Sequence, residues 1–247
     1  MSRPLSSKQL YRKRNAIKKK LLSIVLSMVI ALFILSFSIA CPILIRPVYY
    51  AMTDSLHLPE LTGYSRETII EAYDDMMDYC TRGGEQAGQI FRTGSLSWTE
   101  DGKDHFDDVE RMFRLDFTVL GITGGLLALW LFLKLFLRLR KRPGPEPHRF
   151  LGLGPLFWGP SVLLGIFAAL TIAAVTDFDG FFVWFHHMLF PGKENWLLDI
   201  GTDEIVNILP YEVLQTFGFI IVGLLLAGCA VCIVSDIVYY RKKKRIR

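Results

Sequence analysis

Four long runs of apolar residues alternate with polar segments along the chain. The runs cover residues 21–45, 117–137, 151–176 and 214–238, and each supplies the roughly 20 mostly apolar residues that a helix needs to cross a bilayer. The composition agrees with this pattern, because 51% of the residues are hydrophobic and the mean hydropathy is +0.34. The pattern predicts an all-α membrane protein with four transmembrane helices.

The basic residues predict on which side of the membrane each polar segment lies. Residues 1–20 carry eight Lys and Arg and no acid, residues 138–150 carry five against one Glu, and residues 239–247 carry six. Residues 46–116 carry 7 basic and 15 acidic residues, and residues 177–213 carry one and seven. Because Lys and Arg collect in short cytoplasmic segments, both termini and the middle loop are expected in the cytoplasm and the two acidic segments outside.

The N-terminal region also has some features of a lipoprotein signal peptide, namely a basic stretch and an apolar run that leads to Cys41. The run is about twice the usual length of a signal-peptide core, and Pro42 follows the cysteine directly. A retained anchor helix is therefore expected. Cys229 and Cys232 lie inside the fourth apolar run, where small packing residues are expected rather than a redox pair.

Both acidic segments are expected to contain helical structure outside the membrane. In residues 46–116, Ser65 is a candidate N-cap, and apolar residues recur at helical spacing over residues 69–80. A second polar helix is expected to begin near residues 99–101 and to continue without a break into the second span. The two segments together are expected to form one small, mostly helical extracytoplasmic cap.

Three histidines lie where this cap is expected to meet the membrane. His105 shares one helix face with Asp108, and His186 and His187 follow aromatic residues of the kind that collect at the membrane interface. A single histidine at this depth is explained most simply by a hydrogen bond to a backbone carbonyl. A second histidine at a similar depth favours proton transfer, because imidazoles take up and release protons near neutral pH.

Other polar residues of the cap have both a structural and a functional interpretation. Asp108 is a candidate to orient His105, and it is equally a candidate for a solvated acidic helix face. Asp199 and Asp203, which follow Trp196, are candidates to hold the cap together or to bind a substrate ammonium group.

Other kinds of site find little support in the sequence. Histidines and carboxylates can bind zinc, but no HExxH motif is present and adjacent helical residues point in different directions, so no metal ligand is assigned. The sequence also contains no GxSxG motif, no phosphate-binding glycine loop and no surface typical of nucleic-acid binding. The basic termini are expected to contact anionic membrane lipids instead.

Three stretches carry a resemblance to a known family. They are LPELTGYSRETIIEAYDDMMDY at residues 58–79, HFDDV at residues 105–109 and FHHMLFPGKENWLLD at residues 185–199. In this combination the chain resembles the bacterial lipoprotein intramolecular transacylase (Lit) family, and also the broader set of four-span membrane proteins that share its pattern. The resemblance extends over most of the chain from Tyr49 to Val213.

The resemblance implies an acyltransferase of the bacterial cell membrane. It implies transfer of the sn-2 acyl chain of a diacylglyceryl-cysteine lipoprotein to the α-amino group of the same cysteine, so the expected partners are diacylglyceryl-modified lipoproteins and membrane lipids. The implied catalytic pair is His105 and His186, while His187 lies where the family does not rely on histidine. Further candidates for orienting the histidines or binding substrate are Asp108, Tyr64, Phe185, Trp196, Asp199 and Asp203.

The chemistry of these residue types agrees with such a role. An α-amino group has a pKa of about 7.7–8.0 and must lose a proton before it attacks an ester, and a neutral histidine can accept that proton. The other histidine can polarise or protonate the ester oxygen, and no cofactor is required. The long basic N-terminus and the insertion-like turn PGKEN at residues 191–195 depart from the family pattern.

Two alternatives from other functional classes stay open. A metal-dependent membrane hydrolase that uses the same histidines would lose activity on chelation and regain it with zinc. A non-enzymatic protein whose acidic cap binds a partner or a lipoprotein would keep its cellular role after replacement of His105 and His186.

Overall fold

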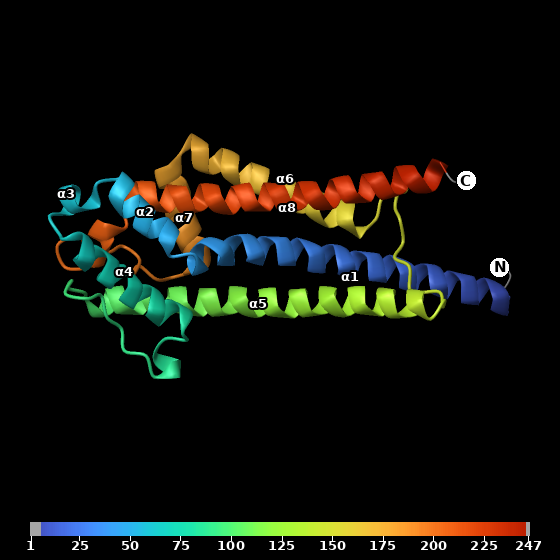
Figure 1. The fold of residues 1–247 in the computed structure, drawn as a ribbon, viewed down its shortest axis with the longest axis horizontal. Helices are drawn as coiled ribbons and strands as arrows, with labels where there is room; N and C mark the ends of the chain where they lie inside the picture. Colours follow the sequence, from blue (N-terminus) through green and yellow to red (C-terminus); the bar gives the residue numbers. More distant parts are fainter. Residues whose placement is uncertain (1–5, 246–247) are drawn as a thin grey trace. The chain divides into compact units, whose positions relative to one another are not determined.

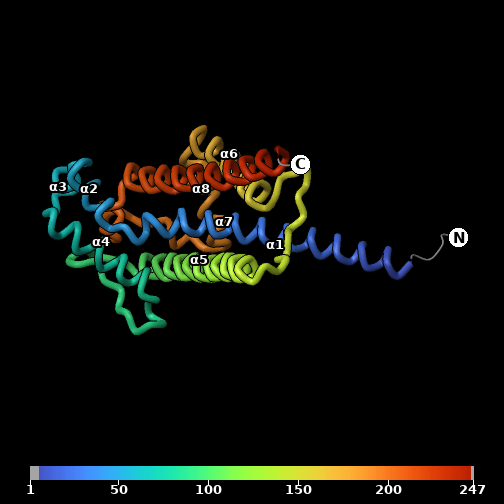
Figure 2. Tube along the Cα trace, turned by 45° about the vertical axis from the view of Figure 1, so that its right-hand side comes forward, coloured from blue at the N-terminus to red at the C-terminus, as the bar shows by residue number. Residues whose placement is uncertain are grey.

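The computed structural model describes residues 6–245, and nearly all of the regular structure in this range is helical (Figures 1 and 2). The described elements are α1 (Ser7–Leu44), α2 (Pro47–Ser55), α3 (Leu58–Thr62), α4 (Arg66–Thr81), η1 (Glu85–Ala87), α5 (Glu100–Leu139), α6 (Pro155–Thr176), α7 (Phe178–Leu189), η2 (Glu204–Ile208) and α8 (Tyr211–Arg245). Within residues 6–245 there is no named strand, and the predicted all-α fold is confirmed.

The helices α1, α5, α6 and α8 are long and apolar enough to cross a membrane. They overlap the four apolar runs, which confirms the prediction of four spans. Much of both basic termini continues these helices, since Lys and Arg are good helix formers, although residues 1–5 and 246–247 lie outside the described range. The 40 residues of α5 extend about 60 Å, roughly twice the thickness of the hydrocarbon core.

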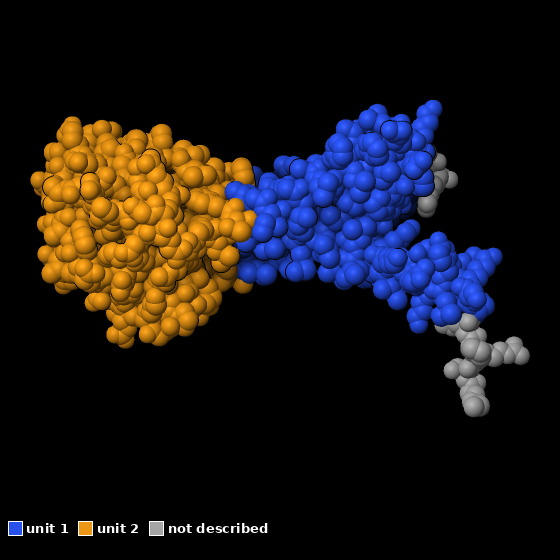
Figure 3. All heavy atoms as spheres, turned by 90° about the horizontal axis from the view of Figure 1, so that it is seen from below, with its two compact units in different colours: residues 1–35, 119–168, 225–247 blue, residues 36–118, 169–224 orange. Residues whose placement is uncertain are grey.

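The chain divides into two compact units, which Figure 3 distinguishes by colour. The first unit contains residues 1–35, 119–168 and 225–247, and the second contains residues 36–118 and 169–224. Each of the four long helices therefore contributes residues to both units. The assignment of segments to the inner or outer side of the membrane stays a prediction.

Apolar packing and a buried ion pair hold the first unit. Its core residues are Ile30, Ile34, Leu163, Leu225 and Cys229. The Arg149 guanidinium lies 3.0 Å from both oxygens of the Asp236 carboxylate. The backbone N–H of Gly154 donates a hydrogen bond to the same carboxylate at 2.7 Å. Because Asp236 is buried, these donors offset the cost of removing its charge from water.

The core of the second unit contains residues from both acidic segments. Tyr49, Ile69 and Tyr73 come from the first segment, and Ile205 and Ile208 come from the second. The Tyr49 and Tyr73 rings stack with their centroids 3.6 Å apart, and the Tyr49 hydroxyl donates to the Ile208 carbonyl oxygen at 2.7 Å. The prediction that the two segments pack together is thus confirmed.

The amphipathic helix expected in the first acidic segment is α4. The Ser65 hydroxyl accepts a hydrogen bond from the Thr68 backbone N–H at 3.1 Å and caps the helix as predicted. On its more polar side, α4 presents Asp78 and Asp74, which form ion pairs with Arg46. These ion pairs fix α4 to the chain just after α1.

Candidate active site

Helix α5 places His105 near its N-terminal end, and a carboxylate from the second acidic segment fixes that end. Buried Asp203 accepts hydrogen bonds from the Thr99 backbone N–H at 2.8 Å and from the Thr99 hydroxyl at 2.9 Å. Gly102 packs on the same carboxylate, where a Cβ atom would overlap with Asp203. His105 follows about one turn later, roughly 18 Å along the helix before the apolar run that begins at Phe117.

Helix α7 carries His186 and His187 in its last turn. The Asp177 side chain caps its start by accepting a hydrogen bond at 2.9 Å from a backbone N–H three residues further on. Much of α7 is aromatic, and Phe181 and Phe185 stack with their ring centroids 6.0 Å apart. The Asp177 N-cap fixes the residue at which α7 begins, and therefore places the two histidines in its last turn.

The rings of His105 and His186 lie beside each other. Their centroids are 6.2 Å apart and their planes are tilted by 37°. The Phe190 ring lies 5.4 Å from the His105 ring and 6.0 Å from the His186 ring. Trp196 stacks on His186 at 4.8 Å, and Phe182 lies 4.0 Å from the same ring. Aromatic side chains thus surround two imidazoles that are close enough to contact one small group together.

The ring nitrogens of the two histidines have different surroundings. The Nδ1 atom of His186 lies 2.7 Å from the Phe182 carbonyl oxygen. Because a carbonyl oxygen only accepts hydrogen bonds, this nitrogen carries the proton and the Nε2 atom keeps its lone pair. The Nδ1 atom of His105 is buried and has no hydrogen-bond partner among the described residues. An unpaired buried polar atom costs about 1–3 kcal/mol, and a catalytic role is one of the reasons for which a native protein retains such an atom.

Burial keeps both imidazoles neutral at physiological pH. It lowers the pKa of His105 to about 4, with neighbouring His186 acting in the same direction, the Asp108 carboxylate opposing it and the Lys193 ammonium adding to it. Burial also lowers the pKa of His186, against the effect of its hydrogen bond to a backbone carbonyl. Both groups are therefore available to accept a proton.

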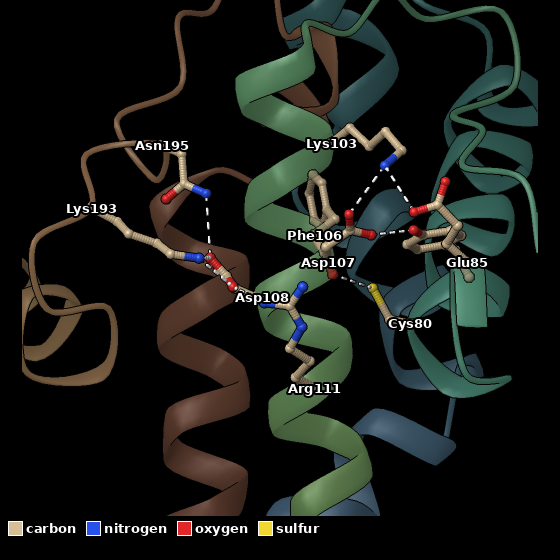
Figure 4. Close-up of polar contacts among 10 residues, drawn as sticks. Cys80, Glu85, Lys103, Phe106, Asp107, Asp108, Arg111, Lys193 and Asn195 are labelled. Atoms are coloured by element: carbon tan, nitrogen blue, oxygen red, sulfur yellow. Dashed lines mark hydrogen bonds and ion pairs between the residues drawn. The ribbon is translucent and has the colours of Figure 1, made fainter. Parts of the chain in front are cut away.

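Asp108 lies one turn after His105 on α5, but its carboxylate accepts hydrogen bonds from other side chains (Figure 4). The Lys193 Nζ atom lies 2.6 Å and 2.5 Å from its two oxygens, Arg111 Nη1 lies 2.9 Å from one, and Asn195 Nδ2 lies 3.4 Å from the other. Burial raises the pKa of Asp108, but Lys193 and the other donors outweigh this effect and hold it below its usual value. No hydrogen bond joins Asp108 to His105 within residues 6–245.

Three other predicted residues lie beside the histidine pair. Trp196 is buried, and its indole N–H donates to the Lys193 carbonyl oxygen at 3.0 Å. Phe185 is exposed and places its ring 5.8 Å from the His186 ring. His187 is exposed and meets the Trp196 ring edge-on at 5.4 Å.

The remaining predicted residues make local or long-range contacts within the second unit. The Tyr64 hydroxyl donates to the Glu204 carboxylate at 3.1 Å, and Asp203 fixes the start of α5. The exposed Asp199 side chain accepts a hydrogen bond at 2.7 Å from the backbone N–H of Gly201 within its own turn. The Asp203 contacts support the structural interpretation of that residue, and use of Tyr64, Asp199 and Asp203 in substrate binding stays a prediction.

Phe190 and Lys193 belong to the site but were not among the predicted candidates. Phe190 touches both imidazoles, and Lys193 pairs with Asp108. One signal was available in the sequence, because Lys193 is the single basic residue of residues 177–213. Among residues 6–245, no group of three or more His, Cys, Asp or Glu residues is arranged to hold a metal ion.

Comparison with known proteins gives the following matches. The family model of the lipoprotein intramolecular transacylase Lit matches residues 24–213. An in meso structure of the membrane integral transacylase Lit from Bacillus cereus is 24% identical, with a TM-score of 0.76 over 94% of this chain and 100% of that chain. Two structures of the same protein with one histidine replaced are 23% identical with TM-scores of 0.73, over 97% and 96% of this chain and 98% and 99% of theirs. A search of curated proteins found no match.

Proposed function

Because the chain belongs to the Lit family of lipoprotein intramolecular transacylases, we propose that it moves the sn-2 acyl chain of a diacylglyceryl-cysteine lipoprotein to the α-amino group of the same cysteine. As a member of this family, it is a membrane acyltransferase that acts on lipoproteins. The observation that supports the proposed transfer is the contact between the His105 and His186 rings among aromatic side chains.

His186 is the proposed general base. Its Nδ1–H is held by the Phe182 carbonyl oxygen, which leaves the Nε2 lone pair free to accept a proton from the substrate amine. The same hydrogen bond favours the protonated ring, as a base requires. His105 has no such partner among the described residues, and its pKa of about 4 makes it the weaker base of the two.

His105 is the proposed hydrogen-bond donor to the reacting ester. When its buried Nδ1 atom carries the lone pair, the Nε2 atom carries the proton and can donate to the ester carbonyl oxygen. That oxygen gains negative charge as the tetrahedral intermediate forms, and a donor aimed at it stabilises the transition state more than the ground state.

The proposed step conserves atoms and charge. The free amine attacks the ester carbonyl carbon, the C–N bond forms, and the amine proton passes to the Nε2 atom of His186. The ester C–O bond then breaks, and the same proton passes to the departing glyceryl oxygen. The product carries an N-acyl chain and a free sn-2 hydroxyl, and both histidines return to their starting state.

Two features favour the proposed reaction. The amine and the ester belong to one molecule, so holding them in a reactive arrangement can contribute about 7–11 kcal/mol. The rings of Phe182, Phe190 and Trp196 surround the histidines and exclude water from the intermediate. Water at this position would hydrolyse the ester instead.

A labelled substrate tests the proposal. A synthetic diacylglyceryl lipopeptide with deuterium in the sn-2 chain alone is mixed with the purified full-length protein in lipid vesicles, and a second lipopeptide carries the label at sn-1. We expect a deuterated N-acyl product from the first substrate only, and no product from a His105→Ala, His186→Ala double variant. Label transfer from sn-1, or an unchanged rate in the double variant, would overturn it.

The proposed function also requires the site to face the side where lipoproteins are modified. The excess of basic residues in residues 1–20 and 239–247 supports a cytoplasmic position for both termini. The histidine-bearing segments would then lie outside. A fluorescent protein fused to the C-terminus should therefore be fluorescent in the cytoplasm, and a fused periplasmic phosphatase should be inactive; the opposite pair of results contradicts this topology.

A further inference from the structure

Residues 190–196 form a strap that carries two of the aromatic walls of the site. The strap begins with Phe190, whose backbone N–H donates to the His186 carbonyl oxygen at 2.7 Å and whose ring lies against both imidazoles. It ends with Trp196, which stacks on the His186 ring. Both aromatic side chains are buried. The position of the strap therefore determines the positions of the Phe190 and Trp196 rings.

Lys193 is the point at which the strap is fixed to α5 (Figure 4). Its ammonium group lies within 2.6 Å of both Asp108 oxygens, and its carbonyl oxygen accepts the indole N–H of Trp196 at 3.0 Å. Asp108 is one turn from His105 on the same helix, and its side chain is only 8% exposed. One residue thus connects the helix of the first histidine to the ring that packs on the second.

We propose that Lys193 is a positioning residue for the proposed transacylation, holding the strap on Asp108 so that His105 and His186 keep their shared geometry. This inference rests on the proposed function. Within the described residues, Lys193 forms no hydrogen bond with either histidine ring. It acts through its contacts with Trp196 and Asp108. Small displacements matter in such a site, because an error of about 1 Å can lower the rate by on the order of 100-fold.

The charges around His105 give a signature that distinguishes this role from simple stabilisation of the fold. The titratable and charged groups that act on His105 are His186 from α7, Asp108 from α5 and Lys193 from the strap. The Lys193 cation lowers the pKa of His105, and the Asp108 carboxylate raises it. Replacing Lys193 should raise that pKa, and replacing Asp108 should lower it.

The test uses the full chain in detergent micelles with ¹³C at histidine Cε1. The protein contains five histidines, and loss of one signal in His105→Ala assigns the signal of His105. Lys193→Met should reduce kcat/KM by about 10- to 100-fold and move the His105 titration to higher pH. Asp108→Asn should also reduce the rate but move the titration to lower pH. Lys193→Arg, which keeps the cation, should recover most of the activity.

Glu194→Gln is the matched control, because Glu194 is an exposed residue of the same strap and should behave as wild type. A wild-type rate in Lys193→Met, or titrations of His105 that do not move in opposite directions, would overturn the role of Lys193. If Lys193→Met melts below the assay temperature, Asp108→Asn removes the same ion pair from the other side and decides the matter. Absence of any N-acyl product from the wild type would defeat the proposed function itself, which is a separate outcome.

Discussion

Replacing His105 by Leu should make the protein more stable at pH 7.5 while it abolishes acyl transfer. The Nδ1 atom of His105 is buried without a partner among the described residues, and such an atom costs about 1–3 kcal/mol. Leu has a similar volume and no polar atom, so the penalty disappears. Stability gained at the expense of activity is the expected behaviour of a residue selected for its chemistry.

The same variant should also resist acid better than the wild type. The folded state holds His105 at a pKa of about 4, against 6.5 in the unfolded chain. Below pH 6.5 the unfolded chain therefore binds a proton that the folded protein refuses, and stability falls as the pH falls toward 4. Between pH 7.5 and pH 5 this single group removes about 2 kcal/mol, or about 4–8 °C of melting temperature for a chain of this size.

Thermal unfolding followed by tryptophan fluorescence in detergent micelles measures both effects. His105→Leu should melt above the wild type at pH 7.5, and the difference should widen by several degrees at pH 5. The control is His57→Asn, because His57 is exposed and has a left-handed backbone with φ of 52° that Asn tolerates. A His105→Leu variant that melts below the wild type at pH 7.5, and loses stability in parallel with it, would refute the reasoning.

Three further outcomes are expected. His186→Gln should eliminate the N-acyl product in the labelled-lipopeptide assay, and His187→Gln should keep roughly the wild-type rate because the His187 ring is exposed; equal losses would contradict the assignment. Asp203→Ala should lower the free energy of unfolding by about 1–3 kcal/mol, because it leaves the Thr99 donors unpaired, whereas Asp199→Asn at an exposed turn should change it by less than about 0.5 kcal/mol. Resistance to limited proteolysis compares the two, and the reverse order would be a contradiction. Dialysis against a strong chelator should leave the initial rate unchanged, because the proposed step transfers its proton through His186 and requires no metal ion; lost activity that zinc restores would contradict the proposal.

Local sequence patterns were sufficient to predict the helices whose ends and apolar faces depend on neighbouring residues. The N-cap at Ser65 and the apolar repeat after it predicted α4, and the unbroken pattern from residue 99 onward predicted one helix that begins well before the second apolar run and continues through it. The four spans and the packing of the two acidic segments followed from hydrophobic length and charge. Short helices such as α2 and α3 were not predicted, because nine or five residues offer too few repeats of the helical period.

The contacts that complete the site join residues far apart in the chain. Lys193 and Asp108 are separated by 85 positions, and Asp203 and Thr99 by 104. No periodicity relates such residues, and the PGKEN turn had the appearance of an insertion that departs from the family pattern. The structure places this turn against α5, where Lys193 pairs with Asp108, whose side chain is 8% exposed. The meeting of His105 and His186 likewise depends on tertiary packing that a single sequence does not show.

The most direct test of the central claim is tandem mass spectrometry of a reporter lipoprotein. The protein is co-expressed with the reporter in a host that makes only diacylglyceryl forms, and fragmentation places each acyl chain on nitrogen or on glycerol, since substrate and product have equal mass. We expect an N-acyl signal with the wild type and its disappearance in the His105→Ala, His186→Ala double variant. An unchanged diacylglyceryl pattern, with the wild-type protein verified in the membrane, would contradict it.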